Sequence, residues 1–165
     1  DNPRQILGKP HHAMYPGVVH VPLIIRFPGG AGAGKRFDEL VYNTDIVATL
    51  YHQSGVAQAM GSELSIDGSD LTPLIQGGGW HPREYLTSRY RDSLWYRDHE
   101  NFVLMDLDGV AGEVFDPRSD PRCRNNLVEQ RHDEVKMAYE RALKDAGGEL
   151  PDYRGMSFTD AIGQR

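Results

Sequence analysis

The chain has 165 residues, a formal net charge of -6 at pH 7, and 39% hydrophobic and 25% charged residues. This composition is ordinary for one globular domain or two small ones. The negative charge argues against nucleic acid or an acidic membrane surface as the main partner. No apolar run approaches the roughly 18 residues of a membrane-spanning helix. The single cysteine, Cys123, excludes an internal disulfide.

Residues 8–30 join a polar loop to a short apolar run. The run from Val21 to Phe27 predicts a strand buried on both faces, of the kind found in α/β sheets. The loop before it carries four candidate site residues: Lys9, His11, His12 and Tyr15. Because α/β enzymes often keep their chemistry in loops at strand ends, we place the candidate site there. Tyr15, which precedes a proline, is more typical of a packing anchor with a bonded hydroxyl.

The charge is unevenly distributed along the chain. Between Asp1 and Arg36 one acidic residue stands against five basic ones, which gives 5 minus 1, or +4. A basic head of this kind favours an anionic substrate, because it focuses positive potential into a cleft. The alternative is that these basic residues form an ordinary solvated surface.

The middle of the chain predicts one helix followed by loops. Asn43 or Thr44 can cap a helix that ends before Gly55, with Ile46, Val47, Leu50 and Tyr51 packed on the sheet. Asp45 is expected to have a capping role, and His52 to be exposed. Residues 61–82 are rich in glycine and proline around the apolar run 71–75, which predicts a loop region that ends near the triple glycine 77–79.

The last half of the chain predicts a small α+β unit. Short strands are expected at Glu84–Tyr90, Leu94–Arg97, Phe102–Leu107 and Glu113–Phe115. Turns at 98–101 and 108–109 would join them into an antiparallel meander. Apolar residues at helical spacing predict a helix from Asp133 to Ala146, ended by two glycines, that covers one face of the sheet.

Several spaced motifs together resemble type I sulfatases, which are members of the alkaline-phosphatase-like superfamily. They are Gly8-Lys9-Pro10, Met14-Tyr15-Pro16, His20-Val21-Pro22-Leu23-Ile24-Ile25-Arg26, the segments 42–50 and 67–75, and Phe115-Asp116-Pro117-Arg118-Ser119-Asp120-Pro121. They occur in the family's order and span nearly the whole chain. The resemblance therefore implies the C-terminal portion of a sulfatase. Residues 1–79 would be the end of its α/β catalytic domain, and residues 80–165 a small antiparallel-sheet subdomain with one packed C-terminal helix.

Two features of that family are not found in the sequence. The Cys/Ser-x-Pro-x-Arg motif, whose first residue matures to the formylglycine nucleophile, is absent, and Cys123 is followed by Arg124-Asn125-Asn126 instead. The family's calcium-binding pair usually lies a dozen or more residues before the lysine, whereas Asp1 and Asn2 stand closer to Lys9. We therefore assign no metal ligand, and expect calcium only in the complete enzyme, held by residues outside this chain.

The resemblance also implies roles for individual residues. Lys9 matches the lysine that contacts the substrate sulfate, and an ammonium group suits that task because it offers three donors and a fixed positive charge. His11 and His12 are candidates for protonating the leaving alkoxide or binding a sulfate oxygen. His81 and Arg89 are candidates for a substrate rim, although residues of these types are common on exposed sheet faces.

The resulting hypothesis is part of a sulfate ester hydrolase that acts on a sulfated small molecule or glycan together with the remainder of the catalytic domain. By itself the chain is expected to be catalytically incomplete. One alternative is a related phosphodiesterase or phosphonate monoester hydrolase. Another is a binding or assembly module without chemistry. The sequence leaves the cellular compartment open.

Overall fold

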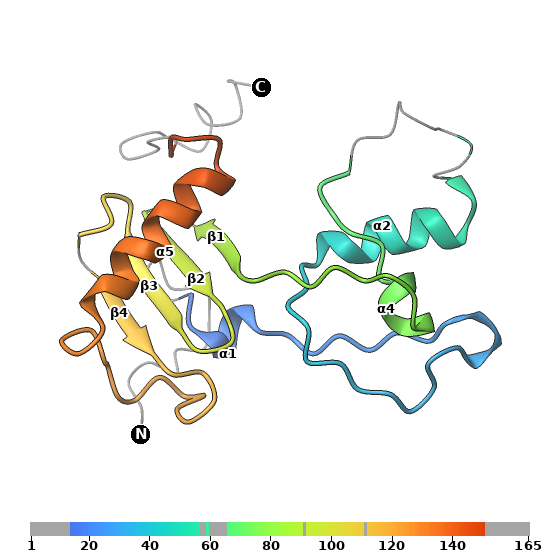
Figure 1. Ribbon diagram of the computed structural model, residues 1–165, viewed down its shortest axis with the longest axis horizontal. Helices are drawn as coiled ribbons and strands as arrows, with labels where there is room; N and C mark the ends of the chain where they lie inside the picture. The colour runs from blue at the N-terminus through green and yellow to red at the C-terminus, as the bar shows by residue number, and fades with distance from the viewer. Residues whose placement is uncertain (1–13, 57–58, 60–65, 91, 111, 151–165) are drawn as a thin grey trace. The chain divides into compact units, whose positions relative to one another are not determined.

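This computed structural model describes residues 14–56, 59, 66–90, 92–110 and 112–150 (Figure 1). The chain divides into two compact units, and each is described by itself. The sheet unit consists of Asp1–Pro22 and Thr87–Arg165, and the helix unit consists of Leu23–Leu86. The boundary expected between residues 79 and 80 stays a prediction.

An antiparallel sheet with one helix forms the centre of the sheet unit. Its four strands, in the order β1-β2-β3-β4, are Leu86–Tyr90, Ser93–Arg97, Phe102–Asp106 and Gly112–Phe115. Helix α5, His132–Asp145, lies across β2, β3 and β4 (Figure 1). The meander, its four strands and its covering helix were all predicted from the sequence and are confirmed.

Side chains alternate between the two faces of this sheet. The register places Leu94, Tyr96, Val103, Met105 and Val114 on one face. Helix α5 covers this face with its buried Val135, Ala138 and Ala142. The opposite face carries Trp95, Arg97, Phe102, Leu104, Glu113 and Phe115. Because the apolar side chains on both faces are buried, the core of this unit extends to either side of the sheet.

The two predicted turns have clear physical causes. The Asp98 carboxylate accepts hydrogen bonds from the backbone N–H groups of Glu100 (2.7 Å) and Asn101 (2.6 Å), which closes the turn between β2 and β3. Between β3 and β4, Gly109 adopts a left-handed φ of 67°. A Cβ atom at that position would lie 2.4 Å from the Tyr139 ring of α5, so only glycine fits there.

Helix α2, Thr44–Gln53, and the short helix α4, Thr72–Gln76, are the main elements of the helix unit. The existence of α2 is confirmed, but its predicted packing is wrong. Its buried residues are the polar Asp45 and Thr49, whereas Val47 and Leu50 are 44% and 60% exposed. Buried hydrogen bonds have set this orientation, because Thr49 Oγ1 accepts from the Leu71 N–H and donates to the Asp45 carbonyl.

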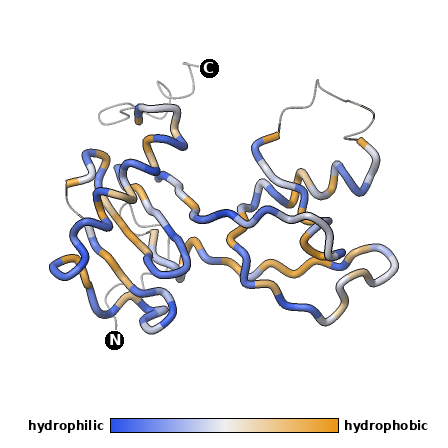
Figure 2. The backbone as a smooth tube through the Cα atoms, viewed as in Figure 1, coloured by the Kyte–Doolittle hydropathy of each residue, from blue (hydrophilic) through white to orange (hydrophobic). Residues whose placement is uncertain are grey.

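The strand predicted at Val21–Phe27 is also not formed. This segment has no regular structure before the 3-10 turn Pro28–Gly30, and Ile24 is 93% exposed. Figure 2 shows a hydrophobic stretch here. An apolar sequence alone does not make a strand, since the backbone needs a paired neighbour. Among the described residues of the helix unit, no strand lies beside it.

Within the described ranges, no helix has both the length and the apolar character needed to cross a membrane.

Replacing Gly109 with alanine should destabilise the sheet unit through a clash with Tyr139. Gly147 is the matched control, because it also has a positive φ, of 83°, but open space at its Cβ position. Both substitutions cost about 1 kcal/mol for the left-handed backbone. Gly109→Ala should cost about 1–3 kcal/mol more because of overpacking. Urea denaturation midpoints measure the difference, and equal midpoints would show that the Tyr139 contact is unimportant.

Tyr96 should make the sheet unit sensitive to alkaline pH. Burial, aided by the hydrogen bond to the Asp98 carboxylate, raises the pKa of Tyr96 well above its usual range. The unfolded chain releases this proton near pH 10, whereas the folded chain retains it. Stability is therefore fully present below about pH 10 and falls as the pH rises above it. Denaturation of wild type and Tyr96→Phe from pH 8 to 11 tests this, and identical pH slopes would contradict it.

Candidate functional site

Three of the predicted site residues, Lys9, His11 and His12, lie outside the described residues. The described residues begin at Met14, two residues after His12. Tyr15 precedes the short helix α1, Pro16–Val19, whose Pro16 is buried. His20, at the end of α1, is exposed.

Tyr15 attaches this segment to the sheet. Its hydroxyl donates a hydrogen bond to the Glu113 carboxylate. Its ring meets Phe115 edge to face, with 6.2 Å between the ring centroids. Both partners project from β4 on the face opposite α5. Tyr15 therefore fixes the point at which the chain leaves the candidate loop, and the prediction of a packing anchor with a bonded hydroxyl is confirmed.

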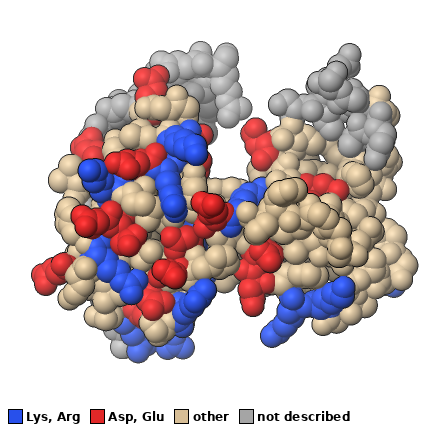
Figure 3. Space-filling view, viewed as in Figure 1, with Lys and Arg blue, Asp and Glu red and all other residues tan. Residues whose placement is uncertain are grey.

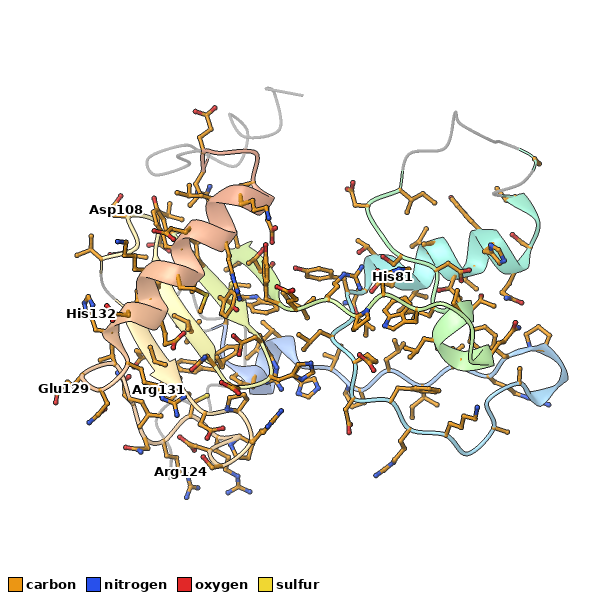
Figure 4. The ribbon with its side chains drawn as sticks, viewed as in Figure 1. His81, Asp108, Arg124, Glu129, Arg131 and His132 are labelled. Atoms are coloured by element: carbon orange, nitrogen blue, oxygen red, sulfur yellow. The ribbon has the colours of Figure 1, made fainter. Side chains whose placement is uncertain are left out.

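The two predicted rim residues belong to different units. His81 is exposed in the loop after α4, in the helix unit (Figure 4). Arg89 is half-buried on strand β1, in the sheet unit. Their participation in a substrate rim stays a prediction.

A buried carboxylate organises the helix unit. Asp45 is completely buried and forms a two-pronged ion pair with Arg83, at 2.8 Å from Oδ2 to Nη1 and 2.7 Å from Oδ1 to Nη2. The same carboxylate accepts from the backbone N–H groups of Tyr42 and Ser69, both at 2.7 Å. Arg83 also lies over the Tyr42 ring, 5.2 Å from its centroid. All the charge on Asp45 is thus engaged within the unit.

The role predicted for Asp45, capping of α2, is only part of what this residue does. Asp45 does bind a backbone N–H before α2, but it also joins α2 to segments that follow 24 and 38 residues later. Gly68 permits the approach, because a Cβ atom there would lie 2.2 Å from the Thr44 carbonyl oxygen. Sequence reasoning missed Arg83, because nothing local distinguishes it from other arginines. With its carboxylate fully paired, Asp45 serves the structure and not the chemistry of a substrate.

A shallow depression of about 370 Å³ lies on the sheet unit. Its lining includes three carboxylates, those of Asp92, Asp106 and Glu113. Carboxylates repel an anionic ligand, so this depression does not suit a sulfate ester. In the part of the chain that the structure describes, no group of three or more His, Cys, Asp or Glu side chains could hold a metal ion.

Removing either partner of the Asp45–Arg83 pair should strongly destabilise the helix unit. Arg83→Met leaves an uncompensated buried carboxylate, which costs about 3–5 kcal/mol. Arg83→Lys should recover only part of this, because an ammonium cannot form the two-pronged contact. Arg36→Met removes an exposed arginine of the same unit and should change the free energy of unfolding by less than about 0.5 kcal/mol. Equal effects of Arg83→Met and Arg36→Met, measured by urea denaturation, would contradict this account.

Comparison with known proteins finds a similar curated sequence and a similar fold. No protein-family profile matches the chain. An N-acetylglucosamine-6-O-sulfatase of Bacteroides thetaiotaomicron is 27% identical over 129 residues, which cover 69% of this chain and 22% of that protein. The chain thus spans about a fifth of the length of this curated relative.

A solved structure concerned with the metabolism of multiple glycosaminoglycans by Bacteroides thetaiotaomicron shares the fold. Its TM-score is 0.57 at 19% identity, over 74% of this chain and 30% of that one. A phosphonate monoester hydrolase of Agrobacterium radiobacter overlaps at a TM-score of 0.49 and 21% identity, over 70% of this chain and 26% of that one. The resemblance that the motifs predicted is confirmed, and the chain is similar to the C-terminal portion of a sulfatase.

Proposed function

We propose that the chain forms part of a sulfatase, an enzyme that hydrolyses sulfate esters. The observation that carries this proposal is the 27% identity over 129 residues with an N-acetylglucosamine-6-O-sulfatase. The ordered motifs of the sequence support it. The relative's name makes a sulfated sugar the substrate class to test first.

Lys9 is the proposed substrate-binding residue of this chain. Hydrolysis of a sulfate ester leaves negative charge on the sulfate oxygens and on the departing alkoxide. A lysine ammonium placed against the sulfate would hold that charge and polarise the group while the S–O bond breaks. His11 or His12 would protonate the alkoxide, since imidazolium is an effective acid near neutral pH.

The attachment of Tyr15 supports this role for the loop. Tyr15 stands six residues after Lys9 in the sequence and is fixed to β4 through Glu113 and Phe115. A loop with one end fixed on a sheet loses less conformational entropy when it binds a ligand. His81 and Arg89 remain proposed contributors to the rim of the substrate site.

The remainder of the catalytic domain is the proposed partner of the helix unit. In the helix unit, the side chains of Leu23, Ile24 and Ile25 are 40%, 93% and 39% exposed. Val47 and Leu50 of α2 are exposed as well. Apolar side chains gathered in this way are normally covered by another surface. A neighbouring strand would pair with the segment at 21–27 and turn it into the buried strand that its sequence favours.

The nucleophile and the calcium ligands are proposed to lie in the part of the catalytic domain outside this chain. The nucleophile motif is absent from the 165 residues. The described residues offer no metal cluster, so they do not fit the calcium ion that the resemblance implies. We therefore propose that this chain contributes substrate binding and not the nucleophile, and that the calcium ligands lie outside its described residues.

The test is an assay of the protein with this chain joined to the remainder of the catalytic domain. The joined protein should release sulfate from N-acetylglucosamine 6-sulfate, whereas the isolated chain should not. Lys9→Ala should lower kcat/KM by about 100-fold or more, the usual effect of removing one group that stabilises developing negative charge. Lys144→Ala, which removes an exposed lysine of α5, is the control and should leave kcat/KM unchanged.

Three outcomes would overturn parts of the proposal. Turnover of a phosphonate monoester without turnover of any sulfate ester would identify the related hydrolase instead. Binding of a sulfated sugar without turnover would favour a module that has no chemistry. Equal kcat/KM values for Lys9→Ala and Lys144→Ala would remove Lys9 from the site.

A further inference from the structure

The connection between β4 and α5 contains several arginines close together in the sequence. Residues 116–125, which we term the arginine loop, carry three arginines: Arg118, Arg122 and Arg124. They also carry two aspartates, Asp116 and Asp120, in a chain whose formal net charge is -6. Three guanidinium groups within ten residues of a negatively charged chain suggest that the loop binds an anionic partner.

Both aspartates of the loop are turned toward the backbone. Asp116 Oδ1 accepts from the N–H groups of Arg118 (2.9 Å) and Ser119 (3.2 Å). Asp120 Oδ2 accepts from the N–H groups of Arg124 (2.6 Å) and Asn125 (2.8 Å). The carboxylates therefore shape the two turns of the loop instead of pairing with its arginine side chains.

The arginine side chains remain on the outside. Arg118, Arg122 and Arg124 are all exposed, and among the described residues none of their guanidinium groups has a hydrogen bond or ion pair. By contrast, Arg131 donates to the Asn101 side chain at 2.9 Å. Figure 3 shows basic side chains gathered at the lower edge of the sheet unit, where Figure 4 places Arg124.

The backbone beneath these arginines is fixed. Cys123, between Arg122 and Arg124, is 1% exposed and has a left-handed φ of 51°. After the loop, Asn126 Oδ1 accepts from the Val114 N–H of β4 at 3.0 Å. A fixed loop presents its side chains with a smaller entropic cost on binding than a loose one.

We propose that the arginine loop binds a sulfated glycan chain. A guanidinium group offers paired N–H donors that match the oxygens of a sulfate group, and several such groups on one loop match the repeated sulfates of a glycan. The choice of a sulfated glycan rests on the proposed function. It extends that function from one sulfate ester to a polymeric substrate held on a second surface of the chain.

Nucleic acid is the other polyanion that an arginine cluster could bind. The arginine loop contains no Phe, Tyr or Trp on which bases could stack. The loop is thus better suited to a sulfated sugar chain than to a nucleic acid strand.

The test measures binding of a heparin oligosaccharide to the protein by calorimetry at several salt concentrations. Arg122→Gln/Arg124→Gln should weaken binding about 10-fold or more near 0.1 M salt. It should also reduce the slope of log Kd against log salt by about one to two. Each arginine contact releases about one counterion from the polyanion on binding, so removing two contacts releases fewer counterions. Lys136→Gln/Lys144→Gln removes two exposed charges from α5 in the same unit and should change neither quantity appreciably.

Equal losses in the two double variants would show that binding follows net charge, which would overturn the proposal. Tighter binding of a DNA oligonucleotide than of the heparin oligosaccharide would overturn it as well. The result is separable from the proposed function. Turnover of a small sulfated sugar tests the sulfatase activity alone, and loss of heparin binding in the arginine variant tests the loop alone.

Discussion

The order of the helix unit depends on the burial of one carboxylate. Among the described residues of this unit, the buried apolar side chains are Phe27, Leu40, Leu71 and Leu86. Asp45 makes up for this small core, because it joins the start of α2, the turn at Ser69 and the side chain of Arg83 through four donors. A charge without solvent is costly unless it is fully paired, so this arrangement selects one conformation of the connecting loops. The sheet unit uses the more common solution, a continuous apolar core with α5 against one face.

The sheet unit was predictable because its signals are local. Two-residue alternation, turn chemistry at 98–101 and 108–109, and helical spacing from 133 to 146 each arise within a few residues and agree with one another. The segment at 21–27 was not predictable, since apolar character predicts burial but does not supply the neighbour that buries it. Arg83 was missed because its partner lies 38 residues away, and a single sequence shows no sign of such pairing.

The candidate site shows the same difference between features with a local sequence signal and features that depend on distant residues. The attachment of Tyr15 could be anticipated from a tyrosine beside a proline, although its partners on β4 could not. Lys9, His11 and His12 rest on motif resemblance, and their chemistry stays a proposal. The arginine loop was hidden in the sequence for another reason. Its two aspartates offset most of the charge of its three arginines, so its composition is nearly neutral. Only the structure shows that the carboxylates bind backbone N–H groups while the arginine side chains are exposed to solvent.

The reach of the Asp45 cluster also has a consequence for the order in which the chain acquires its structure. A chain made from its N-terminus presents α2 well before Arg83, so Asp45 has no cation beside it until 38 further residues have been added. At about 5–20 residues per second, that interval lasts seconds, far longer than a helix needs to form. The antiparallel strands follow directly and pair with sequence neighbours, so they can fold soon after they emerge. Tyr15 waits longer still for its partner, because Glu113 follows it by 98 residues, so the N-terminal segment joins β4 only after the helix unit has its ion pair.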